Sequence, residues 1–346
     1  MRNTKEIEIG SVKIGGNNPI AVQSMLNTKS FDIDKSVLQA EELKKVGCDV
    51  LRIAIPTLED IALIEAIKNK VDIPLVADIH FDYKIALEAV EAGIDKIRIN
   101  PGNIGDDEKV KMVARSCNAK KIPIRIGVNS GSLEKEILSK YGAPTPEALA
   151  ESAMYHISLL ERHDFDNIVV SLKSSNPKIT VDAYRLMNEK CNYPLHLGVT
   201  EAGTKKLGIL KSAAAIGSLL LDDIGDTIRV SLTDNPVEEI YAAHDILKSI
   251  GKKDGIKFVS CPTCGRTRID LIGLAQQVEN ALSNCNKNIT VAVMGCVVNG
   301  PGEAKEADIG VAGGDGCALI FKKGEIIKKV SEKEILSVLL EEIEKM

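Results

Sequence analysis

Short runs rich in valine and isoleucine alternate with amphipathic stretches through the first 250 residues of the chain. Each run is short enough for a strand, and each stretch repeats its apolar residues at helical spacing. The runs predict eight strands, over residues 20–25, 49–55, 75–80, 96–100, 124–129, 168–173, 195–200 and 227–232. The stretches predict eight helices, over residues 34–46, 57–70, 82–92, 106–117, 145–163, 177–191, 203–219 and 236–250. Eight strand–helix units are the inventory of a (β/α)8 TIM barrel, with a doubly wound open sheet as the alternative.

The two faces of the predicted strands differ in polarity, and this difference favours the barrel. One face is aliphatic, as in Ile97 and Ile99, whereas the opposite face of the same run carries Arg98 and Asn100. Helices cover both faces of an open α/β sheet, so both faces of its strands should be apolar. In a barrel, the aliphatic face meets the helices, and polar side chains near the carboxyl ends of the strands lie at the mouth, where active sites form.

Arginine is rare in this chain and gathers on the polar faces of the predicted strands. Four of the 10 arginines lie on four different strands, and Lys173 lies on a fifth. These four are Arg52, Arg98, Arg125 and Arg229. Converging arginines are costly to bury unless they meet anions, and a planar guanidinium suits phosphate oxygens. The sequence therefore predicts a polyanion pocket at the barrel mouth, most simply for a diphosphate.

Internal ion pairs are the alternative role for these arginines. The pattern identifies few acids that face inward on the same strands, chiefly Asp78 and Glu201. Either carboxylate could neutralise an arginine at the end of a strand. Such pairs would make the cluster a structural feature of the barrel rather than a ligand site.

The composition excludes several other classes of protein. Hydrophobic residues make up 44% of the chain and charged residues 27%, with a net charge of −5. Aromatic residues make up only 3% of the chain, so it lacks the stacking platforms of nucleic-acid-binding proteins. The negative net charge also argues against the basic surface that such proteins use. No apolar run is long enough for a transmembrane helix, and we expect no membrane partner. Residues 1–18 lack the apolar segment of a secretory signal, so we expect a cytoplasmic protein with reduced cysteines.

A second domain is predicted where the strand–helix pattern stops, at Asp254–Gly255. We therefore expect a barrel domain over residues 1–253 and a smaller α/β domain over residues 254–346. The smaller domain is predicted to contain strands over residues 256–260, 289–294 and 308–312, a hairpin over 318–330, and helices over 268–284 and 332–345. A unit of about 90 residues is large enough to fold alone.

Five of the eight cysteines fall in this second domain. Cys261 and Cys264 form a Cys-x-x-Cys pair that follows a strand and opens a helix, a pattern shared by zinc sites, iron–sulfur sites and redox disulfides. Cys296 lies on another loop at a strand end, where neighbouring glycines permit close approach to a bulky group. These three cysteines are the candidate metal ligands of the domain.

The fourth ligand distinguishes the possible metal sites. A structural zinc ion requires a fourth Cys or His, and the last histidine of the chain, His244, precedes this domain. Cys285 or Cys317 could be that ligand, although neither lies in a Cys-x-x-Cys loop. Three thiolates with a weaker oxygen donor instead suggest a [4Fe–4S] cluster with one iron open to substrate. Glu303, seven residues after Cys296, is the natural oxygen donor unless it is an ordinary exposed loop carboxylate.

Two segments of the second domain carry a specific resemblance, CPTCGRT at residues 261–267 and MGCVVNGPGEA at residues 294–304. Together they resemble the 4-hydroxy-3-methylbut-2-enyl diphosphate synthases, the iron–sulfur enzymes of the methylerythritol phosphate route to isoprenoids. Barrel segments extend the resemblance, namely QSM at 23–25, ADIHFDY at 77–83, RINPGNIG at 98–105, GVNSGSL at 127–133 and GVTEAG at 198–203. The chain lacks the large insertion of plant-type members and is similar to the short bacterial form.

The resemblance implies a reductive reaction on a cyclic diphosphate. The family opens the ring of 2-C-methyl-D-erythritol 2,4-cyclodiphosphate and removes its C3 hydroxyl, which gives (E)-4-hydroxy-3-methylbut-2-enyl diphosphate. Two electrons arrive through a [4Fe–4S] cluster from reduced flavodoxin or ferredoxin. The family is homodimeric, and the cluster domain of one subunit closes over the barrel of the other.

Carried over to this sequence, the resemblance assigns residues to the cluster and to the substrate. Cys261, Cys264 and Cys296 would bind three irons, and Glu303 would be the displaceable ligand of the fourth and help to protonate the departing oxygen. The substrate would lie on Arg52, Arg98, Arg125 and Lys173, with Asn129, His196, Arg229 and Ser231 lining the same mouth. Two alternatives remain: a non-redox barrel enzyme of the pterin-binding synthase type with a structural zinc, and a phosphate-binding barrel fused to a metal-bound module without catalysis.

Overall fold

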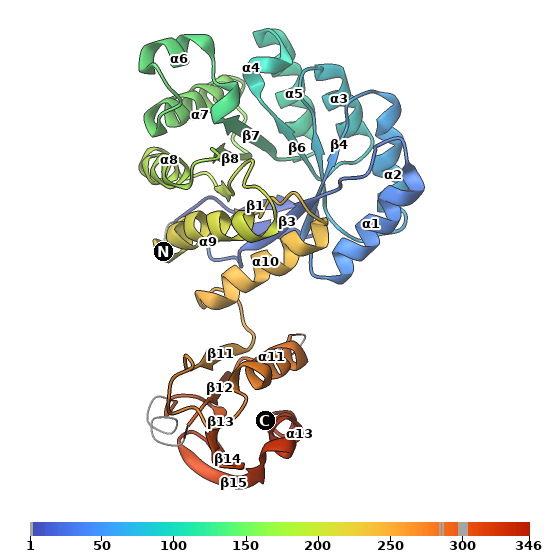
Figure 1. Ribbon diagram of the computed structural model, residues 1–346. Helices are drawn as coiled ribbons and strands as arrows, with labels where there is room; N and C mark the ends of the chain where they lie inside the picture. The colour runs from blue at the N-terminus through green and yellow to red at the C-terminus, as the bar shows by residue number, and fades with distance from the viewer. Residues whose placement is uncertain (1–2, 284, 286, 297–303) are drawn as a thin grey trace. The chain divides into compact units, whose positions relative to one another are not determined.

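Figure 1 shows the computed structural model of the chain, which describes residues 3–283, 285, 287–296 and 304–346. The chain divides into two compact units, residues 1–250 and residues 251–346. Strands and helices alternate through most of the first unit, whereas the second contains a mixed five-stranded sheet.

Eight parallel strands form the barrel of the first unit. They are β3 (Ala21–Met25), β4 (Val50–Ala54), β5 (Leu75–Asp78), β6 (Lys96–Ile99), β7 (Ile124–Asn129), β8 (Ile168–Lys173), β9 (His196–Leu197) and β10 (Thr227–Ile228). Hydrogen-bonded neighbours follow the order β8–β7–β6–β5–β4–β3–β10–β9, and a parallel bridge between Val170 and Leu195 brings the β9 segment back beside β8. The predicted TIM barrel is confirmed, and the open-sheet alternative is wrong.

The last two strands are shorter than the sequence pattern predicts. β9 ends at Leu197 and β10 at Ile228, although the patterns continue to residues 200 and 232. A Cβ atom at Gly198 would lie 2.7 Å from the carbonyl oxygen of Arg229 and 2.7 Å from Lys173 Nζ. The absence of a side chain at Gly198 therefore lets the two segments and Lys173 pack closely where the regular ladder ends.

Helices surround the barrel, and several begin at a side-chain cap (Figure 1). They are α1 (Ile33–Lys45), α2 (Ala62–Lys68), α3 (Tyr83–Glu91), α4 (Pro101–Ile104), α5 (Asp107–Ala119), α6 (Lys135–Tyr141), α7 (Pro146–Glu161), α8 (Pro177–Lys190), α9 (Lys205–Leu221) and α10 (Pro236–Ser249), with short 3-10 turns at Glu59–Ile61 and Ser130–Ser132. Thr145, Asn176 and Asn235 accept hydrogen bonds from first-turn backbone N–H groups of α7, α8 and α10, each of which has Pro at its first position. The sequence pattern does not predict α4 and α6, because neither is long enough for a repeat of apolar residues.

The aliphatic faces of the strands pack outward against the helices, as the period-two pattern predicts. Ile53, Ile97, Ile126 and Val230 are buried in this layer. The opposite faces of the same strands point into the barrel, so the polar residues of the pattern are brought together inside it.

A short hairpin packs on the end of the barrel interior where the strands begin, opposite their carboxyl ends. β1 (Ile7–Ile9) pairs antiparallel with β2 (Val12–Ile14). Its isoleucines form a buried cluster with residues at or near the beginnings of barrel strands, namely Ala21, Val50, Val76 and Val169. Two strands of three residues are too short for the periodicity analysis to detect. This apolar plug leaves the carboxyl ends of the strands as the polar end of the interior.

The second unit is a five-stranded sheet packed on two helices. Its elements are β11 (Lys257–Ser260), α11 (Leu271–Leu282), β12 (Thr290–Met294), β13 (Ile309–Gly314), β14 (Cys317–Lys322), β15 (Glu325–Ser331), a 3-10 turn (Glu332–Glu334) and α13 (Ile335–Glu344). Strands β11, β12 and β13 are parallel, and β14 and β15 continue the sheet as an antiparallel hairpin. Helix α11 begins later than the predicted residue 268, because the Asp270 side chain caps it by accepting from Gly273 N at 3.0 Å.

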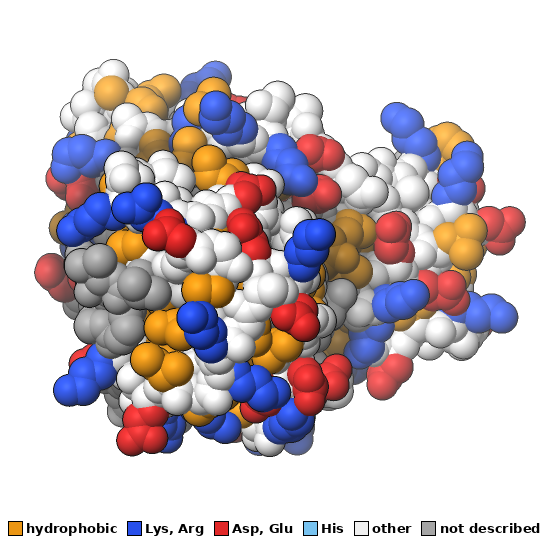
Figure 2. Space-filling view, turned by 60° about the horizontal axis from the view of Figure 1, so that its bottom comes forward, with side chains coloured by type: hydrophobic (Ala, Val, Ile, Leu, Met, Phe, Trp, Pro, Cys, Tyr) orange, Lys and Arg blue, Asp and Glu red, His pale blue; other side chains and the backbone are white. Residues whose placement is uncertain are grey.

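The outer surface mixes charges of both signs. On the face shown in Figure 2, acidic and basic side chains are interspersed with small apolar areas, the pattern of an ordinary solvated surface. None of the helices in the described part of the chain combines the length and the apolar character that a membrane crossing requires.

Candidate active site

A polar cavity of about 180 Å³ lies inside the barrel toward the carboxyl ends of its strands. Its lining residues are Arg52, Arg98, Arg125, Asn129, Ser171, Lys173, Thr200, Arg229 and Ser231. Seven of the eight residues that we expect at the mouth are therefore brought together around one cavity. His196 does not line it, whereas Ser171 and Thr200 do. Both additional residues lie on the polar face of the strand pattern, which is the signal that identifies them.

Strand register places these side chains next to one another. Arg98 lies beside Arg125 in the pairing of β6 with β7, and Asn129 lies beside Lys173 in the pairing of β7 with β8. A Cβ atom on Gly127 would lie 2.5 Å from Arg98 Nε. The glycine therefore makes space for the Arg98 guanidinium inside the barrel.

Asp78 joins two of the arginines in a buried ion-pair network. Its Oδ2 accepts a hydrogen bond from Arg52 Nη2, and its Oδ1 accepts from Arg98 Nη1 at 3.0 Å. The Asp78 carboxylate is only 2% exposed. Burial alone would raise its pKa, but the charges of Arg52 and Arg98 outweigh burial and hold the pKa well below its usual range. Asp78 therefore stays ionised and fixes the two guanidinium groups.

Arg125 is the most deeply buried of the cavity arginines and has no carboxylate partner within the described residues. Its side chain is 1% exposed, and Nε and Nη1 have no hydrogen-bond partner there. Burial lowers the pKa of Arg125, and the charges of Arg52 and Arg98 lower it further. An unpaired buried guanidinium is costly for the empty protein, so it favours an anion in the cavity.

Lys173 and His196 form a second buried contact at the mouth. Lys173 Nζ lies 3.5 Å from His196 Nε2, and His196 Nδ1 lies 2.7 Å from Thr227 Oγ1. Burial lowers the pKa of both side chains, and the charge of Arg125 adds to the effect. His196 is 0% exposed and lies behind the cavity lining rather than in it.

Lys96 is a cation of the barrel interior that the motif analysis overlooks. It is 0% exposed, and its Nζ has no hydrogen-bond partner in the described chain. Burial lowers its pKa strongly, and the charge of Arg125 lowers it further. Lys96 lies two residues before Arg98 on β6, so the alternation that identifies Arg98 also places Lys96 on the inward face.

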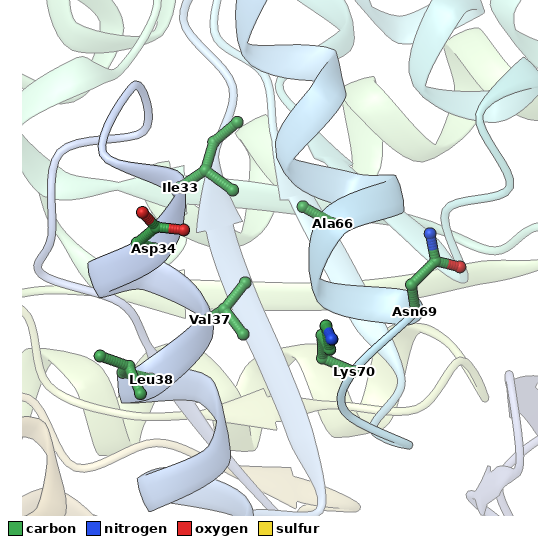
Figure 3. A pocket seen from close by; sticks show the side chains of 7 residues that line it. All are labelled: Ile33, Asp34, Val37, Leu38, Ala66, Asn69 and Lys70. Atoms are coloured by element: carbon green, nitrogen blue, oxygen red, sulfur yellow. The ribbon is translucent and has the colours of Figure 1, made fainter.

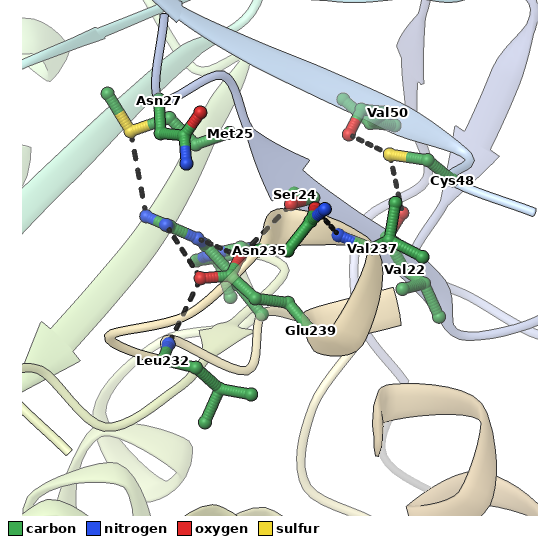
Figure 4. A network of polar contacts seen from close by, with 12 residues as sticks. Val22, Ser24, Met25, Asn27, Cys48, Val50, Leu232, Asn235, Val237 and Glu239 are labelled. Atoms are coloured by element: carbon green, nitrogen blue, oxygen red, sulfur yellow. Dashed lines mark hydrogen bonds and ion pairs between the residues drawn. The ribbon is translucent and has the colours of Figure 1, made fainter. Parts of the chain in front are cut away.

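Arg229 has a partner that does not come from a strand. Its Nε and Nη2 lie 3.3 and 3.4 Å from Glu239 Oε2 and Oε1, respectively (Figure 4). Glu239 belongs to α10 and is 4% exposed. Glu201, which the sequence pattern suggests as an inward-facing acid, is instead exposed and has a left-handed backbone with φ of 52°. Thr200, one residue earlier, still lines the cavity, whereas the left-handed backbone at Glu201 ends the inward-facing run and leaves this side chain exposed.

Cations outnumber carboxylates inside the barrel. The cationic side chains are Arg52, Lys96, Arg98, Arg125, Lys173 and Arg229, and the buried carboxylates in contact with them are Asp78 and Glu239. The ion-pair alternative therefore holds for Arg52, Arg98 and Arg229 but does not account for Arg125 or Lys173. A donor-rich and positively charged cavity suits an anion with several oxygen atoms.

A larger groove on the outside of the barrel lacks comparable chemistry. It measures about 510 Å³ and lies between α1 and α2 (Figure 3). The lining residues are Ile33, Asp34, Val37, Leu38, Ala66, Asn69 and Lys70. These side chains are mostly apolar, and no set of polar groups converges on one point. The barrel mouth is therefore the candidate active site.

The second unit brings the cysteine-bearing segments of β11 and β12 side by side. Ser260 pairs with Val293 in parallel register, which places the following Cys261 close to Gly295. Gly295 N donates a hydrogen bond to Cys261 Sγ at 3.2 Å. Cys296 is buried, whereas Cys264 is exposed, and a backbone hydrogen bond from Arg266 lowers the pKa of the Cys264 thiol. Backbone donors to sulfur stabilise thiolates and tune the clusters that they bind.

The ligand set expected from the sequence lies only partly within the described residues. Glu303 lies outside them, as do residues 297–302 of the same loop. Within the ranges that the structure describes, no three Cys, His, Asp or Glu side chains gather closely enough to hold a metal ion. Cys285 packs against the core of the second unit, and Cys317 pairs with Gly314 in the β13–β14 hairpin. The metal-ligand roles of Cys261, Cys264, Cys296 and Glu303 stay predictions.

Comparison with known proteins gives matches over both units. Residues 4–244 match the GcpE TIM-barrel domain, and residues 257–345 match the GcpE protein C-terminal domain. A protein from Fusobacterium nucleatum subsp. nucleatum, named 4-hydroxy-3-methylbut-2-en-1-yl diphosphate synthase (flavodoxin), is 61% identical over 346 residues, which cover 100% of this chain and 97% of that protein. A protein of the same name from Clostridium perfringens is 57% identical over 344 residues, with 99% of each chain covered.

Solved structures of lower identity share the barrel fold. Dihydropteroate synthase from Xanthomonas albilineans, in complex with 7,8-dihydropteroate, has a TM-score of 0.51 at 15% identity over 70% of this chain and 96% of that chain. The 3-dehydroquinate dehydratase from Geobacillus kaustophilus also reaches 0.51, at 17% identity over 72% of this chain and 99% of that chain. Similarity at this level indicates the fold and carries no function. The two matching domains and the full-length relatives, in contrast, show that the chain belongs to the GcpE family.

Proposed function

We propose that the chain carries out the reaction for which its relatives are named, the formation of 4-hydroxy-3-methylbut-2-en-1-yl diphosphate. The substrate is 2-C-methyl-D-erythritol 2,4-cyclodiphosphate, and its diphosphate binds in the barrel mouth. The observation that carries this proposal is the surplus of buried cations, above all Arg125, whose buried Nε and Nη1 have no partner within the described chain. An anion supplies the missing counter-charge.

The reaction sets the chemical demands on the site. The ring C–O bond to one phosphate breaks, the C3 hydroxyl leaves as water, and a carbon–carbon double bond forms. Two electrons and two protons are consumed for each product. The site must therefore hold a highly charged diphosphate while a neutral water departs.

The cavity residues meet the first demand. Arg52 and Arg98 are fixed by Asp78, so their guanidinium groups are oriented before a ligand arrives. Arg125 and Lys173 supply charge without a carboxylate competitor, and Asn129, Arg229 and Ser231 supply further hydrogen-bond donors. Each charge-assisted hydrogen bond to phosphate contributes about 1.5–3 kcal/mol.

We further propose a [4Fe–4S] cluster in the second unit, held by Cys261, Cys264 and Cys296, with Glu303 as the fourth ligand. The fit rests on the donor set: Cys261 accepts a backbone hydrogen bond beside Cys296, and the unit contains no histidine for a mixed zinc site. When bound, such a cluster supplies the two electrons one at a time. Cys261, Cys264 and Cys296 would hold it, and Glu303 would carry a proton toward the departing oxygen.

Reduced flavodoxin is the proposed electron donor, because the relatives carry it in their names, and ferredoxin is the alternative. A cytoplasmic homodimer completes the proposal. Sedimentation of the purified protein tests the dimer.

Anaerobic purification followed by turnover of the cyclodiphosphate tests the function. The proposal predicts a brown protein with broad visible absorption that dithionite bleaches, and product formation with reduced flavodoxin. A colourless protein with one zinc ion per chain would overturn the cluster assignment and favour the zinc-containing alternatives.

A further inference from the structure

We propose that Glu239 is a positioning residue for the diphosphate site, because it holds the Arg229 guanidinium with its remaining N–H groups toward the cavity. This inference deepens the proposed function and rests on the same pocket. Arg229 lines the cavity, whereas Glu239 does not. Glu239 therefore acts through Arg229 rather than on the ligand.

Both carboxylate oxygens of Glu239 are fully engaged (Figure 4). Oε2 accepts from Arg229 Nε at 3.3 Å and from Ser24 Oγ at 3.0 Å. Oε1 accepts from Arg229 Nη2 at 3.4 Å and from Leu232 N at 3.0 Å. These partners come from two segments, β3 and the stretch that follows β10, so the carboxylate has one defined orientation.

The arrangement leaves part of the Arg229 guanidinium for a ligand. A guanidinium has five N–H donors, and Glu239 engages Nε and Nη2. Nη1 lies 3.6 Å from Met25 Sδ, which is a weak acceptor. An arginine side chain otherwise has many rotamers, and fixing it before the ligand binds removes that entropic cost from binding.

The bond from Leu232 N extends the effect to the neighbouring lining residue. Ser231 directly precedes Leu232 and also lines the cavity. Glu239 therefore fixes the backbone that carries Ser231 as well as the side chain of Arg229. One carboxylate on a helix orients both ligand-facing groups of this segment.

Glu239→Gln distinguishes positioning from simple electrostatics, because the two roles predict opposite changes in the affinity for an anion. If Glu239 only lowers the positive charge of the cavity, its neutralisation should strengthen anion binding. If Glu239 positions Arg229, glutamine turns an NH2 group toward a guanidinium donor, releases Arg229 and weakens binding. Ser24→Ala is the matched control, since it removes one bond to Glu239 and leaves both contacts with Arg229.

The test is a double-mutant cycle with inorganic diphosphate as the probe, measured by calorimetry on the full-length holoenzyme. We expect Glu239→Gln and Arg229→Gln each to weaken binding about 10-fold, and the double variant to be within about twofold of Arg229→Gln. Ser24→Ala should bind within about twofold of the unchanged protein. Thermal unfolding of all four variants accompanies the titrations.

Three results would each overturn the positioning role. The first is a loss of diphosphate affinity in the double variant equal to the product of the two single losses. The others are tighter binding by Glu239→Gln and unchanged binding by Arg229→Gln. The probe does not require turnover, so the result is separate from the proposed reaction. Diphosphate binding with the expected coupling but no conversion of the cyclodiphosphate would reject the reaction and retain the role of Glu239. No diphosphate binding by the unchanged protein would reject both.

Discussion

Lys173 Nζ lies 3.5 Å from His196 Nε2, and both side chains are buried. Lys173 lines the cavity at the barrel mouth, and His196 lies behind it. Burial and the neighbouring charge of Arg125 lower the pKa of each group in the empty protein. The charges of Arg52, Arg98 and Arg229 face Lys173 as well. An anion in the cavity opposes all these repulsions and favours the protonated forms.

Diphosphate binding is therefore expected to take up protons. The pKa of Lys173 is lowered before binding and rises when the negative ligand arrives, so affinity should increase as pH falls from the pKa of Lys173 in the complex toward its pKa in the free protein. Calorimetric titrations in two buffers of different ionisation enthalpy measure the uptake. Lys173→Met should reduce it, and identical apparent enthalpies in both buffers would show that no proton is bound.

Arg125→Met is predicted to separate stability from activity. It removes an unpaired buried guanidinium, so the free energy of unfolding should rise by about 1–4 kcal/mol. Loss of one charge-assisted contact should lower kcat/KM roughly 10- to 150-fold. Urea unfolding and steady-state kinetics measure the two effects. Lower stability with unchanged kinetics would place Arg125 among structural ion pairs.

Asp78→Asn is predicted to be among the most destabilising single changes in the barrel. It leaves Arg52 and Arg98 without their shared carboxylate, at a cost of about 3–5 kcal/mol in unfolding free energy. The lowered pKa of Asp78 means that its stabilisation is present above the unfolded value of 3.8 and is lost as pH falls toward the folded value.

Asp222→Asn is the matched control for that change. Asp222 pairs with Arg185 on the surface, where both side chains are nearly half exposed. Urea unfolding at neutral pH should show a loss of at most about 1 kcal/mol. Equal losses for the buried and the exposed aspartate would show that the Asp78 network contributes little.

Cys296→Ser should abolish iron binding and the visible absorption of the holoenzyme. Cys117→Ser is the matched control, because Cys117 is buried in the barrel core and has no predicted ligand role. Iron content per chain after anaerobic reconstitution is the measurement. Normal iron in the Cys296 variant would remove this residue from the ligand set.

The sequence predicts the inward-facing site well because a strand has a fixed period of two. Arg98 and Arg125 follow from that period alone, and the same period places Lys96, two residues before Arg98 on β6, on the inward face. The inward face continues beyond the regular ladder to Thr200, Arg229 and Ser231, and it does not extend to Glu201. Glu201 lies beyond the end of β9 and turns outward.

Contacts that depend on tertiary structure could not be predicted in the same way. Glu239 reaches Arg229 from a helix, and helical spacing places it on the same buried stripe as Ala243 and Ile246 but does not say which side chain its carboxylate meets. His196 lies on the inward face but deeper than the cavity lining, since alternation gives the face and not the depth. The hairpin of Ile7–Ile9 and Val12–Ile14 is too short to show a period.

Product formation from the cyclodiphosphate is the most direct test of the central claim. The measurement uses anaerobically reconstituted protein with reduced flavodoxin, and compares the unchanged chain with Arg125→Met. The account predicts 4-hydroxy-3-methylbut-2-en-1-yl diphosphate at two electrons per molecule from the unchanged chain, and much slower formation from the variant. Protein that contains a full [4Fe–4S] cluster, accepts electrons from flavodoxin and still releases no product would contradict it.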